Sequence, residues 1–249
     1  MNEHGTQKPA RRTSEVIDLL AEVGYTLRYM ADSGCRGFNC DDPCLEMIRG
    51  WGKKRKTNRV ETLAAIRADL GACRRCSLCE SRKQIVFGEG DVNARLVFVG
   101  EAPGYEEDKR GVPFVGAAGQ LLSKILDAMH LYRDAVYICN IVKCRPPGNR
   151  NPKPNEIVAC KPFLERQLKA IQPEVICALG SFAARTLLET ETPISKLRGT
   201  FYDFRGTRIL PTYHPAYLLR NPEKKRDVWE DMKKLMHLLG LEGSQVPVP

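Results

Sequence analysis

The chain has 249 residues, of which 43% are hydrophobic and 28% charged, a balance that excludes a disordered polyelectrolyte and predicts one compact domain with at most a small appendage. Its net charge of +9 predicts a surface that attracts phosphate backbones, acidic partners or anionic lipids. No apolar stretch has the pattern of a secretion signal or a membrane span, so we expect a cytoplasmic protein with no membrane association. Ten cysteines in a chain without an export signal point to metal binding or catalysis.

The first 57 residues differ in composition from the rest. Residues 1–13 are polar, basic and without periodicity, which predicts a disordered tail. Apolar residues at spacings of three and four predict an amphipathic helix from Ser14, its N-cap, to Asp32. The basic run at 51–58 predicts a solvated linker, with a phosphate-contacting arm as the alternative. Three cysteines lie between the predicted helix and the linker: Cys35, Cys40 and Cys44. They are either ligands of a further metal site or reduced structural thiols. We therefore expect a helical, cysteine-containing appendage over 14–57.

From residue 58 onward, short apolar runs alternate with helical patterns. Four strands are predicted, at Arg95–Gly100, Ala135–Val142, Glu174–Leu179 and Thr207–Thr212. Five helices are predicted, over 60–70, 120–129, 155–170, 181–189 and 223–239. Single helices between strands imply crossover connections and parallel pairing. The expected class is α/β, a three-layer α/β/α sandwich on a mostly parallel four-stranded sheet, with the domain at 58–240 and a short tail at 241–249.

Polar loops follow three of the predicted strands. Glu101 begins a glycine- and proline-rich loop after the first strand, residues 143–150 follow the second, and residues 213–221 follow the fourth. Ligands of parallel sheets bind beyond the carboxyl ends of the strands, so these loops predict a binding site. The alternative is that each loop only shapes a turn. The sequence lacks a P-loop and the zinc-deaminase motif, which makes nucleotide triphosphate binding and base deamination weak hypotheses.

Several cysteines of the domain have a spacing typical of metal ligands. Cys73 and Cys76 are separated by two residues, and Cys144 and Cys160 lie 16 residues apart. Cys79 competes with the first pair. A second close pair, which a zinc ribbon would have, is missing, so the spacing favours an iron–sulfur cluster and leaves zinc or ordinary reduced thiols open.

The motifs of residues 61–240 resemble those of the family 4 uracil-DNA glycosylases. Cys-x-x-Cys is followed in order by Gly-Glu-Ala-Pro-Gly, Pro-Phe-Val-Gly, Asn-Ile-Val-Lys-Cys-Arg-Pro-Pro-Gly-Asn-Arg and His-Pro-Ala-Tyr-Leu-Leu-Arg. The resemblance implies an α/β/α fold and an enzyme that flips uracil out of DNA and hydrolyses its N-glycosidic bond. It also implies a [4Fe–4S] cluster bound by Cys73, Cys76, Cys144 and Cys160. The sequence departs from the family pattern at Tyr105 and in the short loop at 109–111. A related group of proteins that trap DNA covalently has a histidine in a longer insertion at that loop, and this chain has none, so turnover is expected.

The resemblance also assigns the residues of a uracil pocket. Phe114 would stack on the base, Asn140 would bind its edge because an amide offers both a donor and an acceptor, and His214 would donate to uracil O2. Glu101 would polarise or orient the attacking water. The remaining pocket residues would be Glu107, which would obstruct a thymine methyl, Asn149, which would position water or sugar, and Ala102 and Gly104.

DNA contacts are expected from basic residues and from one apolar loop. Tyr217, Leu218 and Leu219 would wedge into the gap left by the flipped base or, alternatively, pack the last helix. The expected phosphate contacts are Arg82, Lys83, Arg145, Arg150 and Arg220. We expect a monomer acting on single- or double-stranded uracil-containing DNA. Two alternatives are a DNA-binding or scaffold protein without turnover and a glycosylase for further deaminated bases.

Overall fold

The computed structural model describes residues 29–30, 32 and 61–241. The chain divides into two compact units, Met1–Thr57 and Asn58–Pro249. Of the helix predicted over 14–32, only Tyr29, Met30 and Asp32 are described, and they are helical. The predicted tail at 1–13, the three N-terminal cysteines and the basic linker lie outside the described residues, as does the C-terminal tail after residue 241.

The domain is built on one mixed sheet of six strands in the order β1-β3-β2-β4-β6-β5. The four central strands are parallel and are the four predicted ones: β2 (Leu96–Gly100), β3 (Tyr137–Asn140), β4 (Val175–Leu179) and β6 (Thr207–Thr212). The prediction of four strands was wrong in number, because β1 (Glu89–Gly90) and β5 (Tyr202–Phe204) pair antiparallel at the two edges. Strands of two and three residues are too short to show alternation, and β5 joins β6 through a tight turn at Arg205 and Gly206, both at positive φ.

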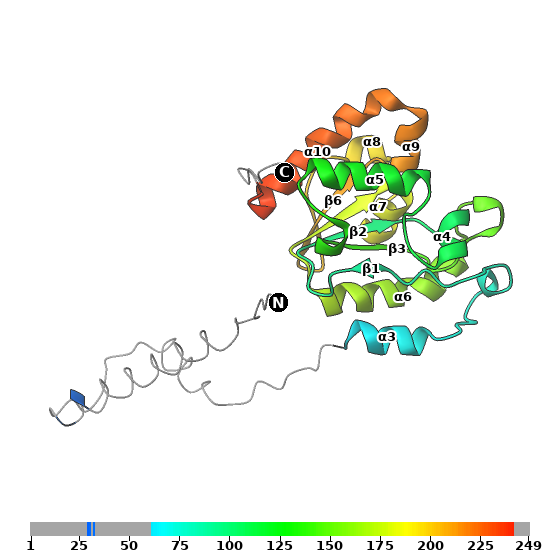
Figure 1. The fold of residues 1–249 in the computed structure, drawn as a ribbon, viewed down its shortest axis with the longest axis horizontal. Helices are drawn as coiled ribbons and strands as arrows, with labels where there is room; N and C mark the ends of the chain where they lie inside the picture. The colour runs from blue at the N-terminus through cyan, green and yellow to red at the C-terminus, as the bar shows by residue number, and fades with distance from the viewer. Residues whose placement is uncertain (1–28, 31, 33–60, 242–249) are drawn as a thin grey trace, which may run out of the picture. The chain divides into compact units, whose positions relative to one another are not determined.

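Helices cover both faces of the sheet and make the three layers (Figure 1). Alternate residues of β2 show this directly, because Leu96 and Phe98 face one apolar cluster whereas Val97 and Val99 face another. The first cluster is closed by α5 (Ala117–Ala128) and α10 (Lys225–Leu239), and the second by α6 (Pro154–Ile171) and α7 (Gly180–Leu188). Every residue of β2 is buried, as expected for a parallel strand covered on both sides.

The predicted helices are present with shifted ends. The first, α3 (Leu63–Leu70), begins three residues later than predicted, because the Thr62 hydroxyl caps it by accepting the Ala65 N–H at 3.1 Å. It packs on α6. Three helices escaped prediction because four to six residues carry too little periodicity: α4 (Tyr105–Arg110), α8 (Ile194–Leu197) and α9 (Pro215–Arg220). Short 3-10 turns occur at η1 (Ser77–Cys79), η2 (Arg133–Ala135), η3 (Pro147–Asn149) and η4 (Pro222–Lys224). Among the described residues, no helix combines the length and apolar character needed to cross a membrane.

Candidate active site and thiol cluster

A cavity of about 360 Å³ opens at the carboxyl edge of the sheet. From β2 the chain first adds β3 on one side and then returns to add β4 on the other, so the strand order reverses at β2. Open α/β sheets bind ligands at such a reversal, because the loops after neighbouring strands separate there. Every predicted catalytic and uracil-binding residue lines this one cavity: Glu101, Ala102, Gly104, Glu107, Phe114, Asn140, Asn149 and His214. The loops that follow the predicted strands thus meet at one cavity.

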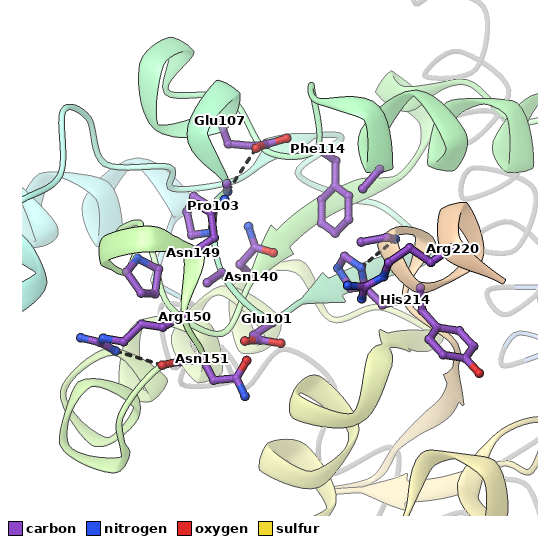
Figure 2. Close-up of a pocket in the computed structure, with 16 residues that line it drawn as sticks. Glu101, Pro103, Glu107, Phe114, Asn140, Asn149, Arg150, Asn151, His214 and Arg220 are labelled. Atoms are coloured by element: carbon purple, nitrogen blue, oxygen red, sulfur yellow. Dashed lines mark hydrogen bonds between the residues drawn. The ribbon is translucent and has the colours of Figure 1, made fainter.

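Phe114 and His214 form two neighbouring sides of the cavity. Their ring centroids are 5.6 Å apart, and Figure 2 shows the two rings beside each other above the end of the sheet. The Phe114 ring lies so close to Gly100, the last residue of β2, that a Cβ there would approach Phe114 Cζ to 2.6 Å. Gly100 thus leaves room for the Phe114 ring itself and for Asn140 Oδ1, which a Cβ would approach to 2.4 Å.

Asn140 ends β3 and carries an unpaired polar atom into the cavity. Its side chain is 1% exposed, and its Oδ1 has no hydrogen-bond partner among the described residues. Its backbone carbonyl accepts a hydrogen bond of 2.8 Å from the ammonium of Lys143, which is fully buried. A buried amide oxygen without a donor carries a desolvation cost, which a bound ligand with an N–H group would relieve.

His214 precedes α9 and is held as a neutral donor. Its Nδ1 accepts the Ala216 N–H at 3.1 Å, which places the ring proton on Nε2. Burial lowers the pKa of His214 to about 4, against a smaller opposing effect of Glu107. Gly180 makes room for it, since a Cβ at that residue would lie 2.9 Å from His214 Cβ. Above pH 5 the imidazole is therefore uncharged and donates through Nε2.

The two carboxylates of the cavity have different environments. Glu101 follows β2, and burial raises its pKa to about 7. Glu107 of α4 instead accepts three backbone N–H groups: Gly104 at 3.1 Å, Val115 at 2.9 Å and Gly116 at 2.8 Å. Glu107 therefore fixes the loop that carries Phe114 and also lines the cavity, whereas Glu101 can exchange a proton near neutral pH.

A basic and aromatic group lies beside the cavity. Arg145 donates through Nε to Asn149 Oδ1 at 2.6 Å, which orients that amide at the cavity wall. Tyr105, the first residue of α4, is 48% exposed. The Arg145 guanidinium lies 5.1 Å and the Lys83 ammonium 5.5 Å from its ring centroid. Cations near an exposed aromatic ring at a cavity suit a phosphate backbone.

Other expected DNA contacts have different positions. Leu218 is 1% exposed and belongs to the apolar core, which favours the alternative that it packs the fold over insertion into DNA, whereas Leu219 is 47% exposed. Tyr217 lines the cavity and stacks on Tyr213, with ring centroids 5.0 Å apart. Arg220 is exposed at the same cavity.

Two of the predicted phosphate contacts are engaged within the protein. Arg150 lines the cavity but pairs with the fully buried Glu156, donating to its two oxygens at 2.9 and 2.7 Å. This ion pair lowers the pKa of Glu156 to about 2. Arg82 donates to Cys144 Sγ at 3.3 Å and to the Ala72 carbonyl at 3.0 Å. Both arginines thus hold structure around the cavity.

The four predicted cluster ligands each receive a hydrogen bond at sulfur. Cys144 accepts from Arg82, and Cys160 of α6 accepts from the Lys143 N–H at 3.3 Å. Cys73 accepts from Arg75 at 3.5 Å, and Cys76 from the Leu78 N–H. Donors aimed at sulfur are typical of thiolates that bind iron–sulfur clusters.

The four thiols also influence one another. The pKa of Cys144 is raised to about 11, mainly by burial and to a smaller extent by Cys160 and Cys76, against the lowering effect of Arg82. A cationic centre is needed to ionise such a set. Within the described part of the chain, no three Cys, His, Asp or Glu side chains lie close enough together to bind a single ion. The donor set suits a larger polynuclear group, which takes thiolates from separate segments.

Three residues of the site lay outside our predictions. Gly180 supports His214, and its signal, a glycine directly after β4, was visible in the sequence. Gly100 was assigned to the end of a strand and to the Gly-Glu-Ala-Pro-Gly motif, but not to the site. Arg133 contacts the Phe114 loop from a distant part of the chain, and no local pattern could have identified it.

Comparison with known proteins agrees with this architecture. The family model described as the Uracil DNA glycosylase superfamily matches residues 87–233, so the fold and the cavity are those of a member of that superfamily. The chain is 45% identical to the type-4 uracil-DNA glycosylase of Thermotoga maritima over 189 residues, 74% of this chain and 98% of the relative. It is 43% identical to the type-4 uracil-DNA glycosylase of Archaeoglobus fulgidus over 73% of this chain and 95% of that protein. The chain belongs to the type-4 uracil-DNA glycosylase family.

Proposed function

We propose that this protein is a DNA repair enzyme that removes uracil from DNA, leaving an abasic site. The observation that carries the proposal is the buried Asn140 Oδ1, which lacks a partner within 61–241 and lies in a cavity beside Phe114 and His214. Uracil presents N3–H as a donor and O4 as an acceptor, and one amide side chain satisfies both. Cytosine has the opposite pattern on that edge and would leave the amide mismatched.

The substrate enters by base flipping, because a base within a duplex is inaccessible. The flipped uracil stacks on Phe114 while Asn140 binds N3 and O4. His214 Nε2–H donates to uracil O2 and stabilises the negative charge that develops on the departing base. The neutral state of this imidazole follows from its lowered pKa.

The bond between deoxyribose C1′ and uracil N1 breaks, and its electron pair leaves with the base. A water molecule oriented by Glu101 adds its oxygen to C1′, and Glu101 accepts the proton. A carboxyl with a pKa of about 7 is half ionised at neutral pH and suits this transfer. Asn149, oriented by Arg145, contacts the sugar or the water.

We further propose that Cys73, Cys76, Cys144 and Cys160 bind a [4Fe–4S] cluster. The hydrogen bonds to all four sulfurs support it. So does Lys143, whose buried ammonium has no carboxylate partner within residues 61–241, because a cluster with four thiolates carries net negative charge. When bound, the cluster would supply a charged cross-link between α6, the loop after β3 and the segment after α3. Lys143 would then hold the Asn140 carbonyl beside that centre.

The proposed substrate is uracil-containing DNA, contacted by Lys83, Arg145 and Arg220 at the cavity. All seven cysteines within residues 61–241 are free, which suits a reducing compartment, and we propose that the protein acts in the cytoplasm as a monomer.

The decisive experiment incubates the purified protein with an oligonucleotide containing one radiolabelled uracil and measures free uracil. We expect release from the parent protein. Asn140→Asp replaces the donor to O4 by a second acceptor, so we expect a loss of at least about 100-fold. Asn151→Asp is the matched control, since it makes the same amide-to-carboxylate change at another residue that lines the cavity. DNA binding without uracil release would refute the proposal in favour of a scaffold role, and equal losses in the two variants would refute the assignment of Asn140.

A further inference from the structure

The backbone of Phe114 is held in an unfavourable conformation. Its φ is +52°, in the left-handed region that bulky residues seldom adopt. This conformation directs the ring toward Gly100 and His214, so it determines where the stacking face lies. An outlier of this kind persists only where the surrounding structure holds it.

Arg133 provides that support from outside the cavity. It begins η2, just before β3, and donates to two consecutive carbonyls: Nη2 to Pro113 O at 2.7 Å and Nη1 to Phe114 O at 3.1 Å. Glu89 of β1 accepts from the same guanidinium at 3.3 Å. The side chain of Arg133 is 28% exposed, whereas that of Glu89 is 51% exposed. Only a forked, planar donor can bind two neighbouring carbonyls and a carboxylate at once.

The opposite side of the same carbonyl is closed by α5. A Cβ at Gly119 would lie 1.9 Å from Phe114 O, so the helix backbone is packed directly against it. Glu107 holds the next two residues of the loop by accepting the N–H groups of Val115 and Gly116. The carbonyl of Phe114 is thus enclosed between Arg133 and α5, which restrains the backbone that carries the ring.

We propose that Arg133 is a positioning residue for uracil binding. It holds Phe114 in the left-handed conformation before the substrate arrives, so that the flipped base meets a preformed stacking face and loses no binding energy to ordering the loop. Arg133 does not line the cavity and therefore acts only through Phe114. Glu89 orients its guanidinium. The inference rests on the proposed function.

The test compares Arg133→Met and Arg133→Lys with Arg95→Met. Arg95 is a matched control because it also pairs with a surface glutamate, Glu174, but precedes β2 at the end of the strand opposite the cavity. We expect R133M to lower kcat/KM for uracil-DNA at least about tenfold, equivalent to about 1.4 kcal/mol. R133K should recover part of this loss through a single hydrogen bond. R95M should stay within about twofold of the parent, as is usual for surface substitutions.

A double-mutant cycle shows whether the effect passes through Phe114. In a Phe114→Ala background, R133M should change kcat/KM by no more than about twofold, because the group it positions is gone. Losses that multiply in the double variant would overturn the inference, as would a folded R133M protein with parental activity. If R133M does not fold, the same cycle is run with R133K.

A crystal structure gives a readout that needs no activity. Phe114 should leave the positive φ region in R133M and keep it in R133K, and an unchanged φ in R133M would overturn the inference. A parent protein that releases no uracil would refute the proposed function, whereas an active parent with an insensitive R133M would refute only the role of Arg133.

Discussion

Replacing Glu101 by glutamine should stabilise the protein while removing its activity. Burial raises the pKa of this carboxyl from 4.5 to about 7, so in the folded state the charged form is disfavoured. Glutamine keeps the size and polarity of the neutral acid and cannot ionise. A residue kept for function at the expense of stability is common in active sites.

The magnitude follows from the two pKa values. A difference of about 2.5 corresponds to about 3.4 kcal/mol at about 1.36 kcal/mol per pKa unit. The carboxyl is partly exposed, and solvent screening reduces this to about 2 kcal/mol. Because the folded state binds the proton more tightly than the unfolded state, the stability of the parent falls as pH rises from about 4.5 to about 7. The gain from Glu101→Gln is therefore small at pH 5 and nearly complete at pH 8.5.

Thermal denaturation at these two pH values measures the effect. For a domain of this size, about 2 kcal/mol corresponds to an increase in Tm of about 4–8 °C at pH 8.5. Glu80→Gln, at an exposed glutamate, serves as the control and should show no such pH-dependent gain. A variant no more stabilised at pH 8.5 than at pH 5 would show that Glu101 is not a buried, proton-binding carboxyl.

Three further predictions concern catalysis, the cluster and DNA binding. The kcat/KM for uracil-DNA should fall about tenfold per pH unit below a pKa of about 7, because Glu101 must be ionised. His214, whose pKa is about 4, should cause no further pH dependence above pH 5. A kcat/KM of the parent protein that does not change with pH would contradict this prediction. The Cys144→Ala variant should lose its iron, measured by elemental analysis, and unfold at a lower temperature. Cys139→Ala, a change in the interior of β3, is the control and should keep its iron. Iron loss in both variants would contradict the assignment of Cys144 as a cluster ligand. The Tyr105→Ala variant should weaken DNA binding and reduce the slope of log K against log salt by about 1 to 2, because each lost phosphate contact changes the slope by about 0.9. Tyr105→Phe, which keeps the aromatic ring, should preserve both the affinity and the slope. An unchanged slope in Tyr105→Ala would exclude Tyr105, Lys83 and Arg145 from the DNA interface.

The sequence by itself determined the central sheet and the identity of the pocket residues. The four parallel strands are continuous apolar runs, and each is long enough to give a signal. The carboxyl ends of such strands necessarily meet at one edge, so Glu101, Asn140 and His214 had to come together once the strands paired in parallel. The order of the motifs then gave the family.

Only the tertiary structure decided the state of each of these groups. The pKa values of Glu101 and His214 depend on burial by segments far away in the chain. Asn140 Oδ1 is unpaired because no hydrogen-bond donor within residues 61–241 reaches it. The burial of Leu218 against α5 and α10 likewise could not follow from a six-residue helix.

The same limit applies to Arg133 and Arg150. In the sequence Arg150 ends a motif and was assigned to a phosphate, whereas Arg133 stands outside every motif. In the structure Arg150 neutralises the buried Glu156, and Arg133 reaches back 19 residues to the Phe114 carbonyl. A guanidinium carries its charge at the end of a long flexible chain, so its partner is fixed by packing and not by local sequence.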